Sequence, residues 1–285
     1  MNILHTFPNQ IPNIEVKRAS GPYLFLSNGL KILDATSGST SNCALGYSNK
    51  KILNKIKSQL NKITNIDIKS WKNPEMYELS KLITKNSIKN MNMVFFTGQS
   101  GSEACEAALL LSFQIHQEQG NNKKRLFMST KETYHGSTLN SLAVGDRKHL
   151  KYLKYIYPKN HIKINENDPV RKRKKNESEK DYVNRLINEF KHKIKKYGSE
   201  NICAFIGEPI LGQLQGDINP AKNYWSQISK ICKTNNIHLI MDEVYTGLGV
   251  CGKYNCTMWE KIAPDFICVG KTLGAGYSPL SAVIM

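Results

Sequence analysis

Long apolar runs are absent from this sequence of 285 residues. No stretch reaches the roughly 18 consecutive apolar residues that a membrane-spanning helix needs. The first residues, Met1–Pro8, also lack the apolar core of a secretory signal peptide. The sequence therefore predicts a cytoplasmic protein with no membrane partner.

The number and spacing of the cysteines do not indicate disulfide bonds. Cysteine occurs seven times, an odd number, at the scattered positions 43, 105, 203, 232, 251, 256 and 268. A chain of this size does not need such bonds to stabilise its core. Cys251 and Cys256 form a C-x4-C pair, but no second Cys or His pair lies nearby to complete a tetrahedral zinc site. We therefore expect reduced thiols and no metal centre.

Acidic residues are few, and the formal net charge is +17. Much of this charge lies between Arg147 and Lys196, where 17 Lys and Arg stand against 6 Asp and Glu. The run Arg171–Lys175 belongs to this region, but no interleaved aromatic residues or known nucleic-acid module accompany it. We interpret the basic region as a solvated surface and expect no nucleic-acid partner.

Short apolar segments alternate with amphipathic helical segments through most of the chain. This alternation is typical of a parallel or mixed sheet that helices cover on both faces, so the predicted fold class is α/β. Strands are predicted at Met93–Phe96, Leu126–Ser129, Cys203–Ile206, His238–Met241, Phe266–Val269 and Ser281–Met285. Helices are predicted at Lys50–Leu60, from Pro74, and at Glu103–Gln117, Ser178–Tyr197 and Asn223–Thr234.

The N-terminal part follows a different pattern. Tyr23–Gly29 and Lys31–Asp34 flank an Asn-Gly pair, which predicts a hairpin. The next segment, Thr36–Asn42, is polar and small, and we expect a loop there.

Three polar segments and one lysine follow predicted strands, where open α/β sheets form their ligand crevice. Thr97–Glu103 enters a helix and offers either a phosphate cradle or a plain helix cap. Tyr134–Gly136 supplies an aromatic face and a histidine, for which a structural role is the more common case. Asp242 and its neighbour Glu243 end a strand. Lys271 is either a solvated loop residue or an amine with a chemical role.

The G-x-G-x-x-G pattern at Gly247–Gly252 lacks the strand and helix that a dinucleotide site requires, so we discount it. The remaining inventory contains an anion cradle, an aromatic platform, a carboxylate and an amine. These groups match pyridoxal phosphate, which carries a phosphate, a flat ring, a pyridine nitrogen and an aldehyde.

Six motifs carry a resemblance to a known family. They are Leu33–Gly38 with Leu45–Tyr47, Ser100–Ala104, Tyr134–Thr138, Gly207–Pro209, Asp242–Gly247 and Gly270–Gly274. As a set they resemble the class III, or ω-type, aminotransferases of the fold-type I pyridoxal phosphate superfamily, over nearly the whole chain.

The resemblance implies roles for individual residues. Lys271 is expected to be the catalytic Schiff-base lysine and Asp242 the partner of the pyridine nitrogen. The other residues implied at the cofactor are Gly101 and Ser102 at the phosphate, Tyr134 and Val244 on the two ring faces, and His135 and Glu208 in the site wall.

The resemblance also implies an activity: ping-pong transfer of an amino group from an amine or ω-amino acid to a 2-oxo acid, in a homodimer. The alternatives are another fold-type I reaction, such as that of an aminomutase or a decarboxylase, and a shortened protein that binds the cofactor without turnover.

The sequence departs from the family pattern at two places, and the resemblance also implies a division into domains. Tyr245 stands where glutamine is common, and Gly249–Gly252 replaces the usual Gly-Arg-Thr-Gly. Residues 1–72 are expected to form an N-terminal segment of the small domain and the active-site entrance. Residues 73–285 are expected to form the incomplete cofactor-binding large domain, and the C-terminal small domain is expected to be absent.

Overall fold

The computed structural model describes residues 13–212 and 214–285. Residues 1–12, which include the N-terminal stretch considered for a signal peptide and part of the predicted N-terminal segment, lie outside this description. The chain divides into two compact units. One runs through Trp71 and includes Ala275–Tyr277, and the other comprises Lys72–Gly274 with Ser278–Met285.

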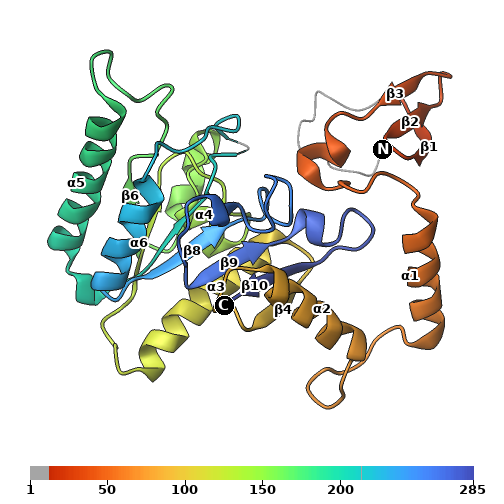
Figure 1. The fold of residues 1–285 in the computed structure, drawn as a ribbon, viewed down its shortest axis with the longest axis horizontal. Helices are drawn as coiled ribbons and strands as arrows, with labels where there is room; N and C mark the ends of the chain where they lie inside the picture. Colours follow the sequence, from red (N-terminus) through yellow and green to blue (C-terminus); the bar gives the residue numbers. More distant parts are fainter. Residues whose placement is uncertain (1–12, 213) are drawn as a thin grey trace. The chain divides into compact units, whose positions relative to one another are not determined.

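The N-terminal unit contains a three-stranded antiparallel sheet and one long helix (Figure 1). The predicted hairpin is confirmed: β2 (Tyr23–Leu26) pairs with β3 (Lys31–Leu33), and β1 (Val16–Ser20) adds a strand that was not predicted. The expected loop instead contains a π-helical turn, η1 (Ser37–Ser41). Helix α1 (Lys50–Lys62) begins where the Asn49 side chain accepts hydrogen bonds from two backbone amides.

The larger unit is built on a seven-stranded sheet with the order β4-β10-β9-β8-β7-β5-β6. Only β10 runs antiparallel to its neighbours; the other strands share one direction. The strands are β4 (Val94–Gly98), β5 (Leu126–Thr130), β6 (His161–Ile164), β7 (Ile202–Gly207), β8 (His238–Asp242), β9 (Phe266–Val269) and β10 (Ser281–Ile284). The predicted α/β fold with a mixed, mostly parallel sheet is confirmed.

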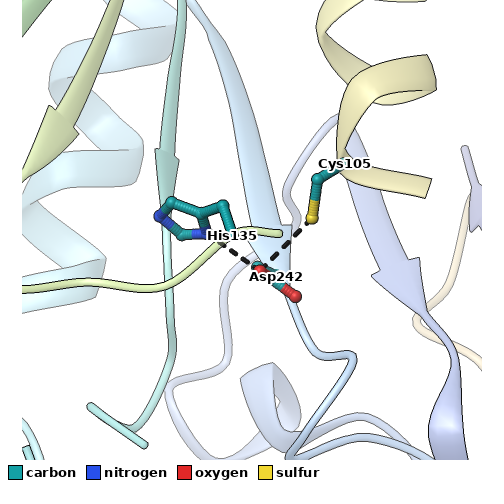
Figure 2. A group of neighbouring side chains, drawn as sticks. All are labelled: Cys105, His135 and Asp242. Carbon is teal, nitrogen blue, oxygen red and sulfur yellow. Dashed lines mark hydrogen bonds and ion pairs between the residues drawn. The ribbon is translucent and has the colours of Figure 1, made fainter. Parts of the chain in front are cut away.

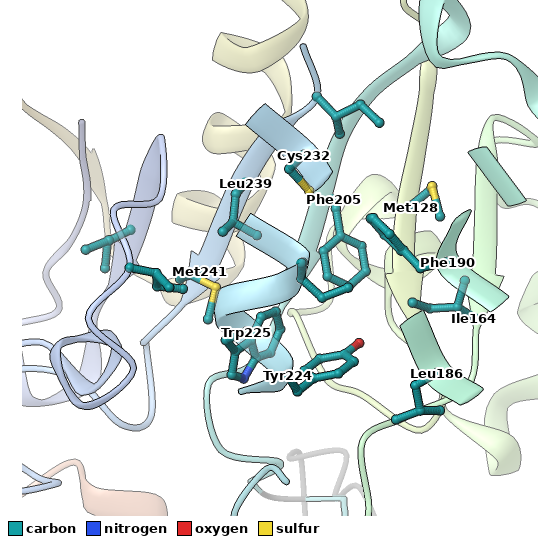
Figure 3. Packing of buried hydrophobic residues seen from close by; sticks show 14 of the residues in the cluster. Met128, Ile164, Leu186, Phe190, Phe205, Tyr224, Trp225, Cys232, Leu239 and Met241 are labelled. Atoms are coloured by element: carbon teal, nitrogen blue, oxygen red, sulfur yellow. The ribbon is translucent and has the colours of Figure 1, made fainter. Parts of the chain in front are cut away.

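Helices cover both faces of this sheet. The α-helices of this unit are α2 (Pro74–Asn86), α3 (Gly101–Glu118), α4 (Leu139–Val144), α5 (Glu179–Tyr197) and α6 (Tyr224–Thr234). The 3-10 helices are η2 (Lys148–Tyr155), η3 (Ser199–Asn201), η4 (Cys256–Trp259) and η5 (Lys271–Leu273). Helices α5 and α6 pack on one face, where Phe190 and Trp225 contact Phe205 of β7 (Figure 3). On the other face, α3 packs against the alternate β7 residues Ala204 and Ile206, and α4 packs against β5 and β6.

The sequence signals at the two ends of α5, Ser178 before its start and Gly198 after its end, are confirmed. Ser178 caps α5 by accepting from the Asp181 amide, and Gly198 ends this helix with a φ of 79°. The helical spacing of Tyr182, Leu186, Phe190 and Ile194 predicts a core-facing stripe, and all four are buried, together with Val183 and Ile187. None of the described helices is both long and apolar enough to cross a membrane.

A stacked pair of imidazoles, the buried His116 and the partly buried His238, lies where α3 meets β8. His116 and His238 stack with their ring centroids 4.0 Å apart. His116 Nε2 lies 3.1 Å from the Cys203 carbonyl oxygen, and His238 Nδ1 lies 2.8 Å from Ser112 Oγ. Burial lowers both pKa values from 6.5 to about 4, and for His116 the neighbouring His238 adds to the effect. Both rings are therefore neutral in the folded protein near neutral pH.

This pair predicts an acid-sensitive fold. Because the folded-state pKa values lie below the unfolded ones, the stability gained from neutral rings is complete above 6.5 and is lost as the pH falls towards 4. The free energy of unfolding should fall by about 1.4 kcal/mol per pH unit for each imidazole. Urea denaturation across this range measures it. His192→Ala, on exposed α5 surface, should keep the pH dependence, and a flat profile in the unaltered chain would contradict the prediction.

Candidate active site

The predicted polar segments meet at one edge of the seven-stranded sheet. Strands β4, β5, β7, β8 and β9 run in the same direction, so their C-terminal ends lie along the same edge. The segments that follow these strands carry all eight residues predicted for the site: Gly101, Ser102, Tyr134, His135, Glu208, Asp242, Val244 and Lys271.

The beginning of α3 forms one wall of this region. Ser100 caps the helix in a capping box with Glu103, whose Oε2 accepts from the Gln99 amide at 2.7 Å. The next two amides, those of Gly101 and Ser102, belong to the first turn and have no intrahelical carbonyl partner. The helix cap uses Ser100 and leaves the amides of the next two residues without an intrahelical partner, so the cap is compatible with an anion-binding role for this helix start.

The loop after β5 lies directly against this helix start. The Ser137 amide donates to Ser102 Oγ at 3.0 Å. A Cβ atom on Gly136, which has a φ of 130°, would lie 2.7 Å from Ser102 Cα. Only glycine permits this close approach.

Asp242, at the end of β8, is 6% exposed, and its carboxylate accepts three hydrogen bonds. The Val244 amide donates to Oδ1 at 3.0 Å. His135 Nδ1 donates to Oδ2 at 2.8 Å, and Cys105 Sγ donates to the same oxygen at 3.3 Å (Figure 2). This network fixes the carboxylate in one orientation.

Lys271 follows β9 and has a φ of 39°, a left-handed conformation that is strained for a residue with a side chain. Its Nζ lies 5.1 Å from the ring centroid of Tyr245. Burial lowers the pKa of the amine, although Asp242 and Glu208 act in the opposite direction. The strained, half-buried position thus gives an amine that loses its proton more readily than an ordinary lysine.

Glu208 follows β7 and is 8% exposed. Its Oε2 accepts from the Tyr134 amide at 3.3 Å. Burial raises the pKa of this carboxyl group to about 8, and the Asp242 charge adds to the rise. Glu208 is therefore largely protonated at neutral pH and can donate a hydrogen bond into the site.

The structure brings the start of α3 next to the segments that contain Asp242 and Lys271. A Cβ atom on Gly101 would lie 2.3 Å from Val244 Cγ1, and one on Gly270 would lie 3.5 Å from the Gly101 backbone. The helix start, the segment after Asp242 and the residue before Lys271 therefore touch one another. The helix start, a carboxylate and an amine of lowered pKa are therefore close enough to contact one ligand.

This contact gives a stability prediction. Gly101→Ala should lower the free energy of unfolding by about 1–3 kcal/mol, because the added methyl group overlaps Val244. In a Val244→Ala background the same substitution should lower it much less, since the overlapping methyl groups are gone. Urea denaturation of the four proteins in this cycle measures the coupling. Additive effects would show that the two residues do not touch.

Two further residues at this edge were not recognised from the sequence. The Arg147 guanidinium covers one face of Tyr134, with Cζ 4.1 Å from the ring centroid, so only the other face can stack on a ligand. Cys105 lies on the buried face of α3, where it resembled ordinary core. Only the three-dimensional contact with Asp242 identifies it, because 137 positions separate the two residues.

Sequence comparison places the chain among known proteins. A sequence model of the family Aminotransferase class-III matches residues 6–285. The uncharacterized aminotransferase YodT of Bacillus subtilis is 32% identical over 270 residues, which are 95% of this chain and 60% of that protein. The adenosylmethionine-8-amino-7-oxononanoate aminotransferase of Helicobacter pylori is 34% identical over 275 residues, or 96% of this chain and 59% of that enzyme. The chain spans about 60% of the length of these curated relatives.

Solved structures agree with this placement. An ω-transaminase of Pseudomonas jessenii in complex with PMP matches with a TM-score of 0.93 and 27% identity, over 100% of this chain and 63% of that chain. The ω-transferase of Vibrio fluvialis JS17 matches with a TM-score of 0.89 and 28% identity, over 96% of this chain and 64% of that chain. These matches confirm the predicted fold-type I architecture. The chain belongs to the class III aminotransferase family, which its motifs resemble.

Proposed function

We propose that the protein to which this sequence belongs is an aminotransferase that moves an amino group from an amine or ω-amino acid to a 2-oxo acid. Class III aminotransferases depend on pyridoxal phosphate, and we propose the same cofactor here. The observation that carries the proposal is the convergence of a half-buried lysine of lowered pKa with the buried carboxylate Asp242 beside the start of α3.

The residues present fit this cofactor. The amides of Gly101 and Ser102 would bind its phosphate, and the close approaches at Gly101 and Gly270 leave the backbone near the ligand. Asp242 would pair with the pyridine nitrogen, and Lys271 would react with the aldehyde. When bound, the cofactor supplies a carbonyl that links to amines and a ring that withdraws electrons from the substrate carbon.

The remaining predicted residues would orient the ring. Val244 and the uncovered face of Tyr134 would lie on its two faces. His135 would act through Asp242, since its Nδ1 hydrogen bond fixes the carboxylate that meets the ring nitrogen. Glu208 would donate a hydrogen bond from its protonated carboxyl group.

Lys271 would also move the proton during the reaction. A base must be unprotonated to remove a proton from the donor carbon, and burial lowers the pKa of this amine. Asp242 is fixed by three hydrogen bonds before the substrate arrives, so little reorganisation is needed when charge develops near it.

The test is transfer of isotopically labelled nitrogen. The chain, loaded with pyridoxal phosphate, is incubated with a labelled ω-amino acid and either pyruvate or 2-oxoglutarate, and the new amino acid is analysed by mass spectrometry. Labelled nitrogen in that product is expected. Rearrangement or loss of carbon dioxide from the donor without transfer would instead favour an aminomutase or a decarboxylase.

Cofactor retention without any turnover would favour the non-catalytic alternative. The same assay should therefore include a measurement of bound cofactor by absorbance after gel filtration. A chain that neither retains the cofactor nor transfers nitrogen would contradict the proposed function.

We further propose a homodimer, an assignment supported by the family resemblance and testable by analytical ultracentrifugation. A cytoplasmic location is supported by the seven cysteines, all of which carry free thiols in the structure. The assignment of residues 1–72 to a small domain stays a prediction.

A further inference from the structure

Three potential metal ligands of different chemistry meet at Asp242. The thiol of Cys105, an imidazole nitrogen of His135 and a carboxylate oxygen of Asp242 all lie within 4.8 Å of one another (Figure 2). Within residues 13–212 and 214–285, no other group of three His, Cys, Asp or Glu residues meets this geometric condition. The ligands come from α3, from the loop after β5 and from the end of β8.

The distances are close to those of a tetrahedral zinc site. Zinc bonds of about 2.3 Å to sulfur and about 2.0 Å to nitrogen or oxygen place neighbouring ligand atoms roughly 3.3–3.5 Å apart. In the structure, Asp242 Oδ2 lies 3.3 Å from Cys105 Sγ and 2.8 Å from His135 Nδ1. The third separation, between the thiol and the imidazole nitrogen, is within 4.8 Å. Rotation of the Cys105 and His135 side chains would bring the three ligand atoms to the zinc distances.

The charges of the three ligands suit a buried divalent ion. A thiolate and a carboxylate together balance the two positive charges of zinc, and a neutral imidazole adds none. Neutrality matters because Cys105, His135 and Asp242 are all buried, and an unbalanced charge there would be costly. His135 Nε2 is also buried and has no hydrogen-bond partner among the described atoms, so no contact of that nitrogen holds the ring in its present position.

We propose that the chain, when free of cofactor, binds one Zn²⁺ ion through Cys105, His135 and Asp242. On binding, a sulfur–zinc bond replaces the S–H bond of Cys105, whose proton leaves to solvent. The proton of His135 Nδ1 moves to Nε2, so that Nδ1 binds the metal and the imidazole stays neutral, with no change of oxidation state. The fourth coordination position takes a water molecule. Soft and borderline divalent ions bind this set of ligands, whereas Mg²⁺ and Ca²⁺ prefer oxygen atoms alone.

Zinc and pyridoxal phosphate then exclude each other, a consequence that rests on the proposed function. Asp242 cannot hold a metal ion and pair with a pyridine nitrogen through the same carboxylate. The metal would therefore keep the chain in a form that does not load its cofactor.

The first measurement uses cofactor-free protein and zinc alone. Zinc is titrated in competition with a chromophoric chelator, and Co²⁺ is used separately to detect a thiolate-to-metal absorption band. Cys105→Ser keeps a hydrogen-bond donor to Asp242 but removes the soft ligand. Cys251→Ser is the matched control, because it removes the more exposed member of the C-x4-C pair. Circular dichroism verifies that each variant is folded.

We expect one zinc ion per chain in the unaltered protein and in Cys251→Ser, with binding weakened by about tenfold or more in Cys105→Ser. The cobalt thiolate band should vanish only in Cys105→Ser. No stoichiometric binding to the unaltered chain, or equal binding to all three proteins, would overturn the site.

The second measurement tests exclusion. Cofactor attachment, trapped with borohydride, should be slowed by zinc in the unaltered protein and restored by a chelator, but not slowed in Cys105→Ser. This variant also controls for zinc bound by the cofactor in solution. Zinc that binds at the site without slowing attachment would overturn the exclusion. Failure to take up the cofactor in the absence of zinc would count against the proposed function and leave the zinc titration valid.

Discussion

Lys271→Ala is expected to abolish covalent attachment of pyridoxal phosphate to the chain. The reason is that the Lys271 amine is half-buried, has a lowered pKa and lies near Asp242 and Glu208. An unprotonated amine is the form that attacks an aldehyde. Borohydride reduction followed by peptide mass spectrometry measures the attachment, and the modified peptide of the unaltered chain should contain Lys271.

Two variants separate chemistry from charge. Lys271→Arg keeps a positive charge but offers no amine that adds to the aldehyde, so it should also lack the attachment. Lys253→Ala removes a lysine that stacks on Trp259 with Nζ 4.1 Å from the ring, and it should keep the attachment. If transfer activity is present, loss of Lys271 should reduce it at least about 10²–10⁴-fold, the usual contribution of a proton-transferring group. Attachment at another lysine in the unaltered protein would refute the assignment.

The elements that the sequence predicted well are those with long or sharply bounded patterns. Helix α5 has a serine cap, a four-residue apolar stripe at helical spacing and a terminal glycine, and all three act as expected in the structure. Strand β7 is buried at every position, so its apolar run was distinct. Strand β6 was missed because Lys163 interrupts its apolar residues. The lysine is tolerated there because its amine donates to Ser129 Oγ and to the carbonyl groups of Val144 and Gly145.

The candidate site shows the same limit. Strand ends could be located from the sequence, so the segments containing Lys271 and Asp242 were found. Their proximity depends on strand order: β8 and β9 are consecutive in the chain, and the folded sheet also makes them neighbours. Cys105 and Arg147 were missed for this reason: one lies in an apolar helix face and the other in a basic segment, and neither pattern signals a site by itself.

Asp242→Asn is the second substitution with a large expected effect. Asparagine keeps the shape of the side chain but is neutral, so it cannot stabilise a proton on a pyridine nitrogen. The covalent attachment through Lys271 should persist, because the aldehyde end of the cofactor is unaffected. Transfer activity should fall by about 10²–10³-fold, the usual effect of removing a preorganised electrostatic group. The pH dependence of the absorbance of the bound cofactor should also change.

A loss of activity could also follow from a weakened fold, since an amide at position 242 can accept at only one of its two terminal atoms. It would leave either the Val244 amide or the His135 and Cys105 donors without an acceptor, at about 1–3 kcal/mol. Glu243→Gln is the matched control. Glu243 is adjacent and buried, and its carboxylate accepts from the backbone amides of Cys256 and Thr257. A glutamine side chain at position 243 should therefore weaken the fold to a similar extent. Equal losses of activity in Asp242→Asn and Glu243→Gln would show that Asp242 has only a structural role. A loss confined to Asp242→Asn, together with a changed cofactor spectrum, identifies the charge of Asp242 as the functional property.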